Sequence, residues 1–145
     1  MRKKRVIVVD DDDNVIALLK TFFEDRDYEV LSYNSPAHCP IYKQHEDCTL
    51  DDKCSDILMI DQKMPFMTGL EQLQRQQNNG CKLHNMNKTL MTGEKEQAVR
   101  DKADELGVNF LSKPFRIGDV KKWVDACEER IDRSEPVSSA HKMTE

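Results

Sequence analysis

No apolar run in the 145-residue sequence approaches the roughly 20 residues that a membrane-spanning helix needs, which excludes a membrane-spanning protein. A secretory signal is also missing, because the short apolar run behind the basic N-terminus ends at a cluster of aspartates. The chain has no basic stripe either: 27 Asp and Glu residues outnumber 22 Lys and Arg residues, and the net charge is -5. We therefore expect a cytoplasmic protein that does not bind nucleic acid directly.

Tight Cys-x-x-Cys spacing is absent, although the chain has five cysteines. An odd number of cysteines without an export signal favours reduced thiols over a disulfide framework. Some cysteines and histidines have a spacing that a zinc site could use, and reduced loop cysteines without a metal are the alternative. These candidate ligands form two sets: Cys39, His45, Cys48 and Cys54, and separately Cys81 with His84.

The composition is that of one compact, highly charged domain, with 38% hydrophobic and 34% charged residues. We expect this domain to span residues 1–131. Residues 35–55 carry two prolines, three cysteines and few apolar residues, which predicts one short helix followed by an irregular insertion at about 37–55. Periodicity ends near residue 132, so residues 132–145 are expected to form a flexible tail.

Short apolar runs alternate with segments of helical periodicity. The runs at 6–9, 28–33, 57–60, 89–92 and 108–111 predict strands. Apolar residues at three- and four-residue spacing predict helices that begin at 13 and 70, a helix over 94–106 and a last helix over 120–131. This alternation predicts an α/β fold, a parallel sheet with helices on both faces.

Polar residues follow the predicted strands where their apolar runs end: Asp10 and Asp11, Asp61, Thr92 and Lys113. In an open parallel sheet, ligands bind at the carboxyl ends of the strands. Three carboxylates at one edge repel one another unless a cation joins them, and such oxygen ligands suit Mg²⁺. Lys113 and Thr92 could hold phosphoryl oxygens, and a carboxylate can itself accept a phosphoryl group. The residues therefore predict a Mg²⁺-dependent phosphoryl site.

With these motifs the chain resembles a response-regulator receiver domain of two-component signalling, over roughly residues 5–131. The matching segments are Val8–Asp12, Asp61–Gly69, Met91–Gly93 and Phe110–Phe115, which follow in the expected order at strand ends. The resemblance implies a flavodoxin-like, doubly wound five-stranded parallel sheet of strand order 2-1-3-4-5 with helices on both faces.

The resemblance also implies a metal site and a phosphoacceptor. By this likeness Asp61 accepts the phosphoryl group from a histidine kinase or a phosphotransfer protein. Asp10 and Asp11 are the acidic pair on the metal side, and Asp61 together with the main-chain carbonyl of Lys63 completes the protein ligands of Mg²⁺.

The remaining implied roles concern the switch. Lys113 is expected to bind the phosphoryl group, and the hydroxyl of Thr92 to move toward it, so that Phe110 turns inward. This biases a surface around the fourth helix and fifth strand toward a protein partner. Such a domain is a signalling switch with only intrinsic autophosphorylation and autodephosphorylation activity, not a metabolic enzyme. We expect it to stand alone, because the roughly 14 residues after the last helix cannot form a DNA-binding domain.

Other readings remain open. A small haloacid-dehalogenase-type phosphatase would use Asp10 as its nucleophile, but Asn14 stands where that motif usually has threonine or valine, and Asp61 is left unexplained. A phosphorylation-independent, receiver-like binding module is another alternative. The acidic run at 10–13 could simply cap the first helix. The chain could also be a fragment of a longer regulator.

Overall fold

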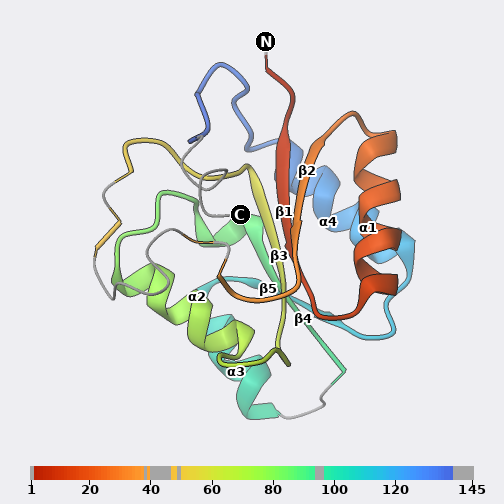
Figure 1. Cartoon of the computed structure of the whole chain (residues 1–145), viewed down its shortest axis with the longest axis vertical. Helices are drawn as coiled ribbons and strands as arrows, with labels where there is room; N and C mark the ends of the chain where they lie inside the picture. The colour runs from red at the N-terminus through yellow and green to blue at the C-terminus, as the bar shows by residue number, and fades with distance from the viewer. Residues whose placement is uncertain (1, 38, 40–46, 49, 94–96, 139–145) are drawn as a thin grey trace.

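The computed structural model describes residues 2–37, 39, 47–48, 50–93 and 97–138. Its sheet has five parallel strands in the order β2-β1-β3-β4-β5 (Figure 1). The strands are β1 (Arg5–Val9), β2 (Glu29–Tyr33), β3 (Ile57–Asp61), β4 (Lys88–Thr92) and β5 (Asn109–Ser112). This order confirms the predicted flavodoxin-like fold, and all five strands form where the apolar runs predict them.

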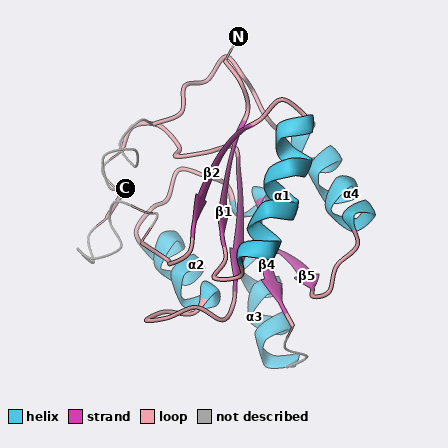
Figure 2. Cartoon of the chain, turned by 45° about the vertical axis from the view of Figure 1, so that its right-hand side comes forward, coloured by secondary structure: helices cyan, strands magenta, loops and turns pink. Residues whose placement is uncertain are grey.

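Four helices and one short 3-10 turn complete the described fold. The helices are α1 (Asp13–Asp25), α2 (Gly69–Asn78), α3 (Gln97–Leu106) and α4 (Ile117–Glu128), and the turn η1 spans Asn85–Asn87. Helices α1 and α4 cover one face of the sheet, and α2 and α3 cover the other (Figure 2). The doubly wound arrangement predicted from the sequence is therefore confirmed.

Alternate residues of each inner strand pack into two separate hydrophobic cores, one on each face of the sheet. In β1, Val6 and Val8 pack toward α1 and α4, whereas Ile7 and Val9 pack toward α2 and α3. Successive side chains of a strand point to opposite faces, so a continuous apolar run fills both cores. This is why the inner strands have no solvent-facing side, and why their polar residues lie at the strand ends, as Lys88 and Thr89 do at the start of β4.

The stretch between β2 and β3 differs from the regular pattern. Its described residues (34–37, 39, 47–48 and 50–56) contain no helix. The rest of the predicted short helix and irregular insertion lies outside the described residues. The stretch before β3 ends at Asp56, a fully buried carboxylate that accepts hydrogen bonds from Arg2 Nη1 at 2.7 Å, Arg2 Nη2 at 2.8 Å and Arg5 N at 2.8 Å.

Beyond α4, the described residues 132–138 run back along the N-terminal end of the sheet. Arg133 Nε donates to Arg2 O at 2.7 Å, and Arg5 Nη1 donates to Ser138 O at 2.6 Å. The boundary between domain and tail at residues 131 and 132 stays a prediction. No helix among the described residues is long and apolar enough to cross a membrane.

Candidate functional site

The carboxyl ends of the strands meet at one edge of the sheet, at the bottom of Figure 1. Asp10 follows β1 directly, Asp61 is the last residue of β3, and Thr92 is the last residue of β4. Lys113 follows β5, and its backbone N–H donates to Thr92 O at 2.8 Å. We call this edge, with Asp10, Asp11, Asp61, Thr92 and Lys113, the carboxyl edge.

Three carboxylates converge at the carboxyl edge. Each of Asp10, Asp11 and Asp61 offers an oxygen atom, and these oxygens all lie within 4.8 Å of one another. Asp10 and Asp61 are buried, whereas Asp11 is exposed. This arrangement matches the predicted acidic set, and its oxygen-only chemistry fits Mg²⁺.

The acidic run at 10–13 is divided between two tasks. Asp12 caps α1, because its Oδ1 accepts a hydrogen bond from Asn14 N at 2.9 Å. Asp10 instead turns toward the sheet edge, and its Oδ1 accepts from Asp12 N at 2.9 Å. Helix capping therefore explains Asp12 but not Asp10.

Lys113 bridges the two buried carboxylates. Its Nζ donates to Asp10 Oδ2 at 2.8 Å and to Asp61 Oδ1 at 3.0 Å. Burial opposes the charge on this ammonium, but the hydrogen bonds to the two carboxylates raise the pKa of Lys113 above its ordinary value. Lys113 therefore stays charged and partly neutralises the site.

One lysine does not balance this much negative charge. Burial raises the pKa of Asp61 to about 6, with further increases from Asp10 and Asp11, although the hydrogen bond from Lys113 lowers it. A bound cation would stabilise the ionised form of Asp61 and relieve its repulsion from Asp10 and Asp11. The site is thus suited to a divalent cation in both donor atoms and charge.

The loop between β3 and α2 is held by two groups that the motif alone does not single out. Gln62 accepts hydrogen bonds from Gly69 N at its backbone oxygen (3.1 Å) and from Leu70 N at its Oε1 (2.9 Å). Thr68 and Glu71 form a capping box at the start of α2. Gly69 packs directly on the backbone carbonyl of Asp61. The threonine-glycine pair before a helical pattern is the signal that marks this junction.

Gly69→Ala is expected to lower the free energy of unfolding by about 1–3 kcal/mol. A Cβ atom there would clash with the carbonyl oxygen of Asp61 and lie 2.8 Å from Leu90 Cδ1. Urea denaturation of both proteins measures the change. The matched control is Gly118→Ala in α4, where a Cβ meets nothing within 4 Å. It should be neutral or stabilising by about 0.5–1 kcal/mol, and equal losses at both positions would contradict this account.

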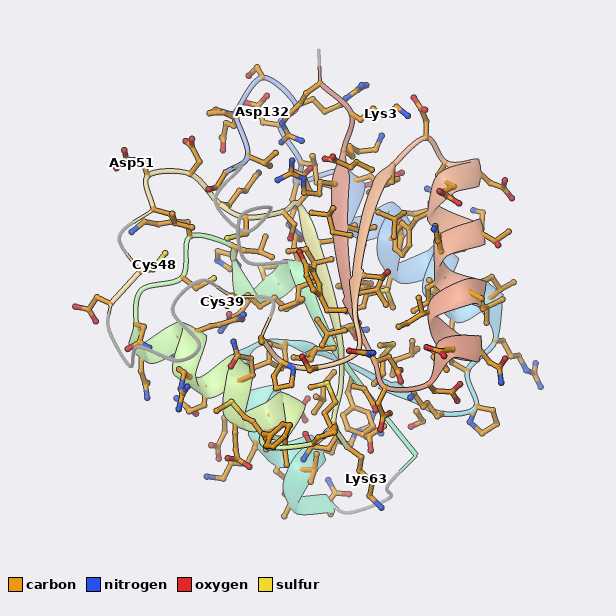
Figure 3. The ribbon with its side chains drawn as sticks, in the orientation of Figure 1. Lys3, Cys39, Cys48, Asp51, Lys63 and Asp132 are labelled. Carbon is orange, nitrogen blue, oxygen red and sulfur yellow. The ribbon has the colours of Figure 1, made fainter. Side chains whose placement is uncertain are left out.

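The other predicted site residues lie outside the cluster that Lys113 forms with the aspartates. Thr92 is buried at the end of β4. Phe110 is half-buried on the α3 side of the sheet, where the guanidinium carbon of Arg100 lies 5.2 Å from the ring centroid. Lys63 is exposed, in the loop after β3 (Figure 3). The structure thus brings Asp10, Asp11, Asp61 and Lys113 into one cluster, with Thr92 beside it and Phe110 apart from it.

Comparison with protein families agrees with this geometry. The family model described as "Response regulator receiver domain" matches residues 6–125. The chain belongs to this family. Receiver domains are signalling modules that work with histidine kinases, which confirms the resemblance found in the sequence.

Solved structures support the same fold. The receiver domain of Francisella response regulator 1452 is 21% identical, with a TM-score of 0.70 over 88% of this chain and 98% of that one. The non-phosphorylated HemR receiver domain from Leptospira biflexa is 20% identical, with a TM-score of 0.71 over 90% and 98%. A two-component response regulator from Clostridium difficile is 17% identical, with a TM-score of 0.69 over 88% of this chain and 98% of that one. No curated protein sequence matches significantly.

Proposed function

We propose that this receiver domain is a Mg²⁺-dependent phosphorylation switch in which Asp61 accepts the phosphoryl group. The observation that carries the proposal is the bridge from Lys113 Nζ to both Asp10 (2.8 Å) and Asp61 (3.0 Å), beside a third carboxylate. Asp10, Asp11, Asp61 and the main-chain carbonyl of Lys63 would hold the metal. When bound, Mg²⁺ supplies positive charge that stabilises the phosphoryl oxygens in the transition state.

Asp61 acts as the nucleophile. A carboxylate oxygen of Asp61 forms a bond to phosphorus while the bond from phosphorus to the donor's histidine nitrogen breaks, and that nitrogen takes up a proton. With a pKa of about 6, Asp61 is ionised in most molecules at neutral pH. Once Asp61 is esterified, Lys113 Nζ keeps its bond to Asp10 and turns its remaining donors to the phosphoryl oxygens.

The new phosphoryl group then reaches the switch residues. Thr92 lies on the strand next to Asp61 and carries a hydroxyl that can donate to a phosphoryl oxygen. Movement of Thr92 leaves space into which Phe110 turns. The ring would then leave Arg100, which now lies over it at 5.2 Å, and so change the surface of α3 and β5.

The partner of this switch is a protein. We propose a histidine kinase or phosphotransfer protein as the donor and a protein target for the α3–β5 surface, with no direct binding of nucleic acid or membrane. Helix α3 is the fourth helix expected from the sequence, because the sequence also predicts a short helix between β2 and β3. The domain would act in the cytoplasm, as a switch whose only activities are its own phosphorylation and dephosphorylation.

Two aspartate variants separate this function from a haloacid-dehalogenase-type phosphatase. With acetyl phosphate and Mg²⁺, Asp61→Asn should abolish covalent phosphoryl labelling, because the acceptor oxygen becomes an amide. Asp10→Asn should slow labelling but leave the label on Asp61. Loss of the label in Asp10→Asn with full labelling of Asp61→Asn would instead assign the nucleophile to Asp10.

A binding experiment distinguishes the switch from a phosphorylation-independent module. Beryllium fluoride, a phosphoryl analogue, should bind with Mg²⁺ at the carboxyl edge and change which proteins the domain captures. The same partners, captured equally with and without beryllium fluoride and equally by Asp61→Asn, would contradict the switch.

A further inference from the structure

Four of the five cysteines gather at one flank of the sheet, by the C-terminal end of α2. They are Cys39, Cys48, Cys54 and Cys81, here called the cysteine cluster. Cys48 N donates a hydrogen bond to Asn79 O, and Cys81 N donates to Gln76 O at 2.9 Å, so both are held against this helix end. Figure 3 shows Cys39 and Cys48 on this same flank.

Three residues of the cluster share one cavity. Cys39, Cys54 and Cys81 line a small cavity of about 20 Å³, which is room for a single water-sized body. The fold therefore brings Cys81, which the sequence set apart with His84, beside Cys39 and Cys54.

A buried lysine lines the same cavity. Lys88, at the start of β4, is fully buried, and its Nζ donates to the neutral Oε1 of Gln76 at 2.9 Å. Among the described residues no carboxylate forms an ion pair with Lys88. A buried ammonium without an anion is costly, so its presence in a cavity lined by three cysteines points to an anionic partner there.

We propose that the cysteine cluster binds one thiophilic divalent ion of the zinc type, with Lys88 as the buried counter-charge. Zinc held by four thiolates carries net negative charge, which gives Lys88 its missing partner. Two disulfides would be neutral and would leave the lysine without one. On binding, each ligand thiol loses its proton to solvent as its sulfur bonds to the metal.

This assignment selects among the ligands that the sequence left open. His84 is exposed, and its Nδ1 accepts a hydrogen bond from Met86 N at 3.1 Å, so it belongs to the start of η1. His45 lies outside the described residues. Among the described side chains no three cysteine sulfurs all lie within 4.8 Å of one another, whereas oxygens of the three aspartates do. The four sulfurs must therefore draw together to reach zinc–sulfur distances of roughly 2.3 Å, which would fasten the β2–β3 stretch to α2.

Cobalt titration tests the site directly. The full chain, reduced and stripped of metal, is titrated anaerobically with Co²⁺ in excess Mg²⁺, so that Mg²⁺ occupies the carboxylates. We expect one equivalent of Co²⁺ to give the thiolate-to-cobalt charge-transfer absorption of a tetrahedral sulfur site, and one equivalent of Zn²⁺ to remove it. Serine at any one of the four cluster positions should reduce this absorption and weaken binding. Cys127→Ser is the matched control, since Cys127 is buried in the opposite core, and should bind like the unmodified chain.

The role of Lys88 has its own readout. Lys88→Met should weaken zinc affinity by about 10–100-fold, whereas Lys20→Met, which removes an exposed charge from α1, should leave it unchanged.

Three results overturn the proposal: no charge-transfer absorption with all five thiols reduced, equal loss in Cys127→Ser, or purified protein whose cluster is paired in disulfides. Phosphoryl labelling of Asp61 is measured separately in the same variants, so failure of the metal site leaves the switch intact and the reverse also holds.

Discussion

Lys113→Met is expected to lower the free energy of unfolding of the metal-free protein by about 3 kcal/mol. The substitution keeps most of the side chain's apolar volume but removes the cation that joins Asp10 and Asp61, at 2.8 Å and 3.0 Å. Both carboxylates are nearly inaccessible to water, so neither can replace the lost partner by hydration. One of them must bind a proton or force the site open.

Equilibrium urea unfolding in the presence of a chelator measures this loss. Mg²⁺ should restore part of it, since it binds the folded site and supplies the missing positive charge. Lys121→Met is the control, because its ion pair with Asp125 is exposed, and such pairs contribute about 0–1 kcal/mol. Similar losses for both lysines, or a loss at Lys113 that Mg²⁺ does not reduce, would contradict the proposed charge balance.

Asp61→Asn is expected to do the opposite and stabilise the metal-free protein by about 3 kcal/mol at neutral pH. The pKa of Asp61 is raised from 3.8 to about 6, chiefly by burial and then by Asp10 and Asp11, against the hydrogen bond from Lys113. An acid whose pKa is higher in the folded state binds protons more tightly there, so its ionisation destabilises the fold. The asparagine amide removes this cost.

The sign of this effect gives it a definite pH dependence. Below the unfolded-state pKa of 3.8, Asp61 is protonated in both states and the variant has no advantage. The advantage grows as pH rises and is complete above the folded-state value of about 6. Urea unfolding of both proteins at several pH values checks this, with chelator present. Asp125→Asn is the control of opposite sign, because hydrogen bonds from Lys121 and Arg26 lower the pKa of Asp125. A constant difference between Asp61→Asn and the unmodified chain across this pH range would refute the linkage.

The fold could be predicted from the sequence because its inner strands are buried on both faces. A continuous apolar run such as 57–60 predicts a strand that is covered by helices on both faces. This run ends directly before Asp61, a residue of the site. The carboxyl edge follows from the rule that parallel strands end together, which is why Asp10, Asp61 and Lys113 could be grouped before their distances were known.

Features that depend on tertiary contacts could not be predicted in this way. Asp10 and Asp12 look alike in an acidic run, and only their hydrogen bonds separate a site residue from a helix cap. Lys88 appears too polar for an interior strand, and it is tolerated because Gln76, on a different element, reaches it. The sequence grouped Cys39, Cys48 and Cys54 as candidate metal ligands, but only the fold shows that Cys81, rather than His84, lies with them.

The central claim is that Asp61 carries the phosphoryl group. The most direct test treats the Mg²⁺-loaded chain with acetyl phosphate and then with borohydride, which reduces an aspartyl phosphate to homoserine. Mass spectrometry of the peptide that contains residue 61 should show homoserine at that position, only in samples given both Mg²⁺ and the donor. Unmodified aspartate at position 61 in a chain whose intact mass shows phosphorylation, or an intact mass that never changes, would contradict the account.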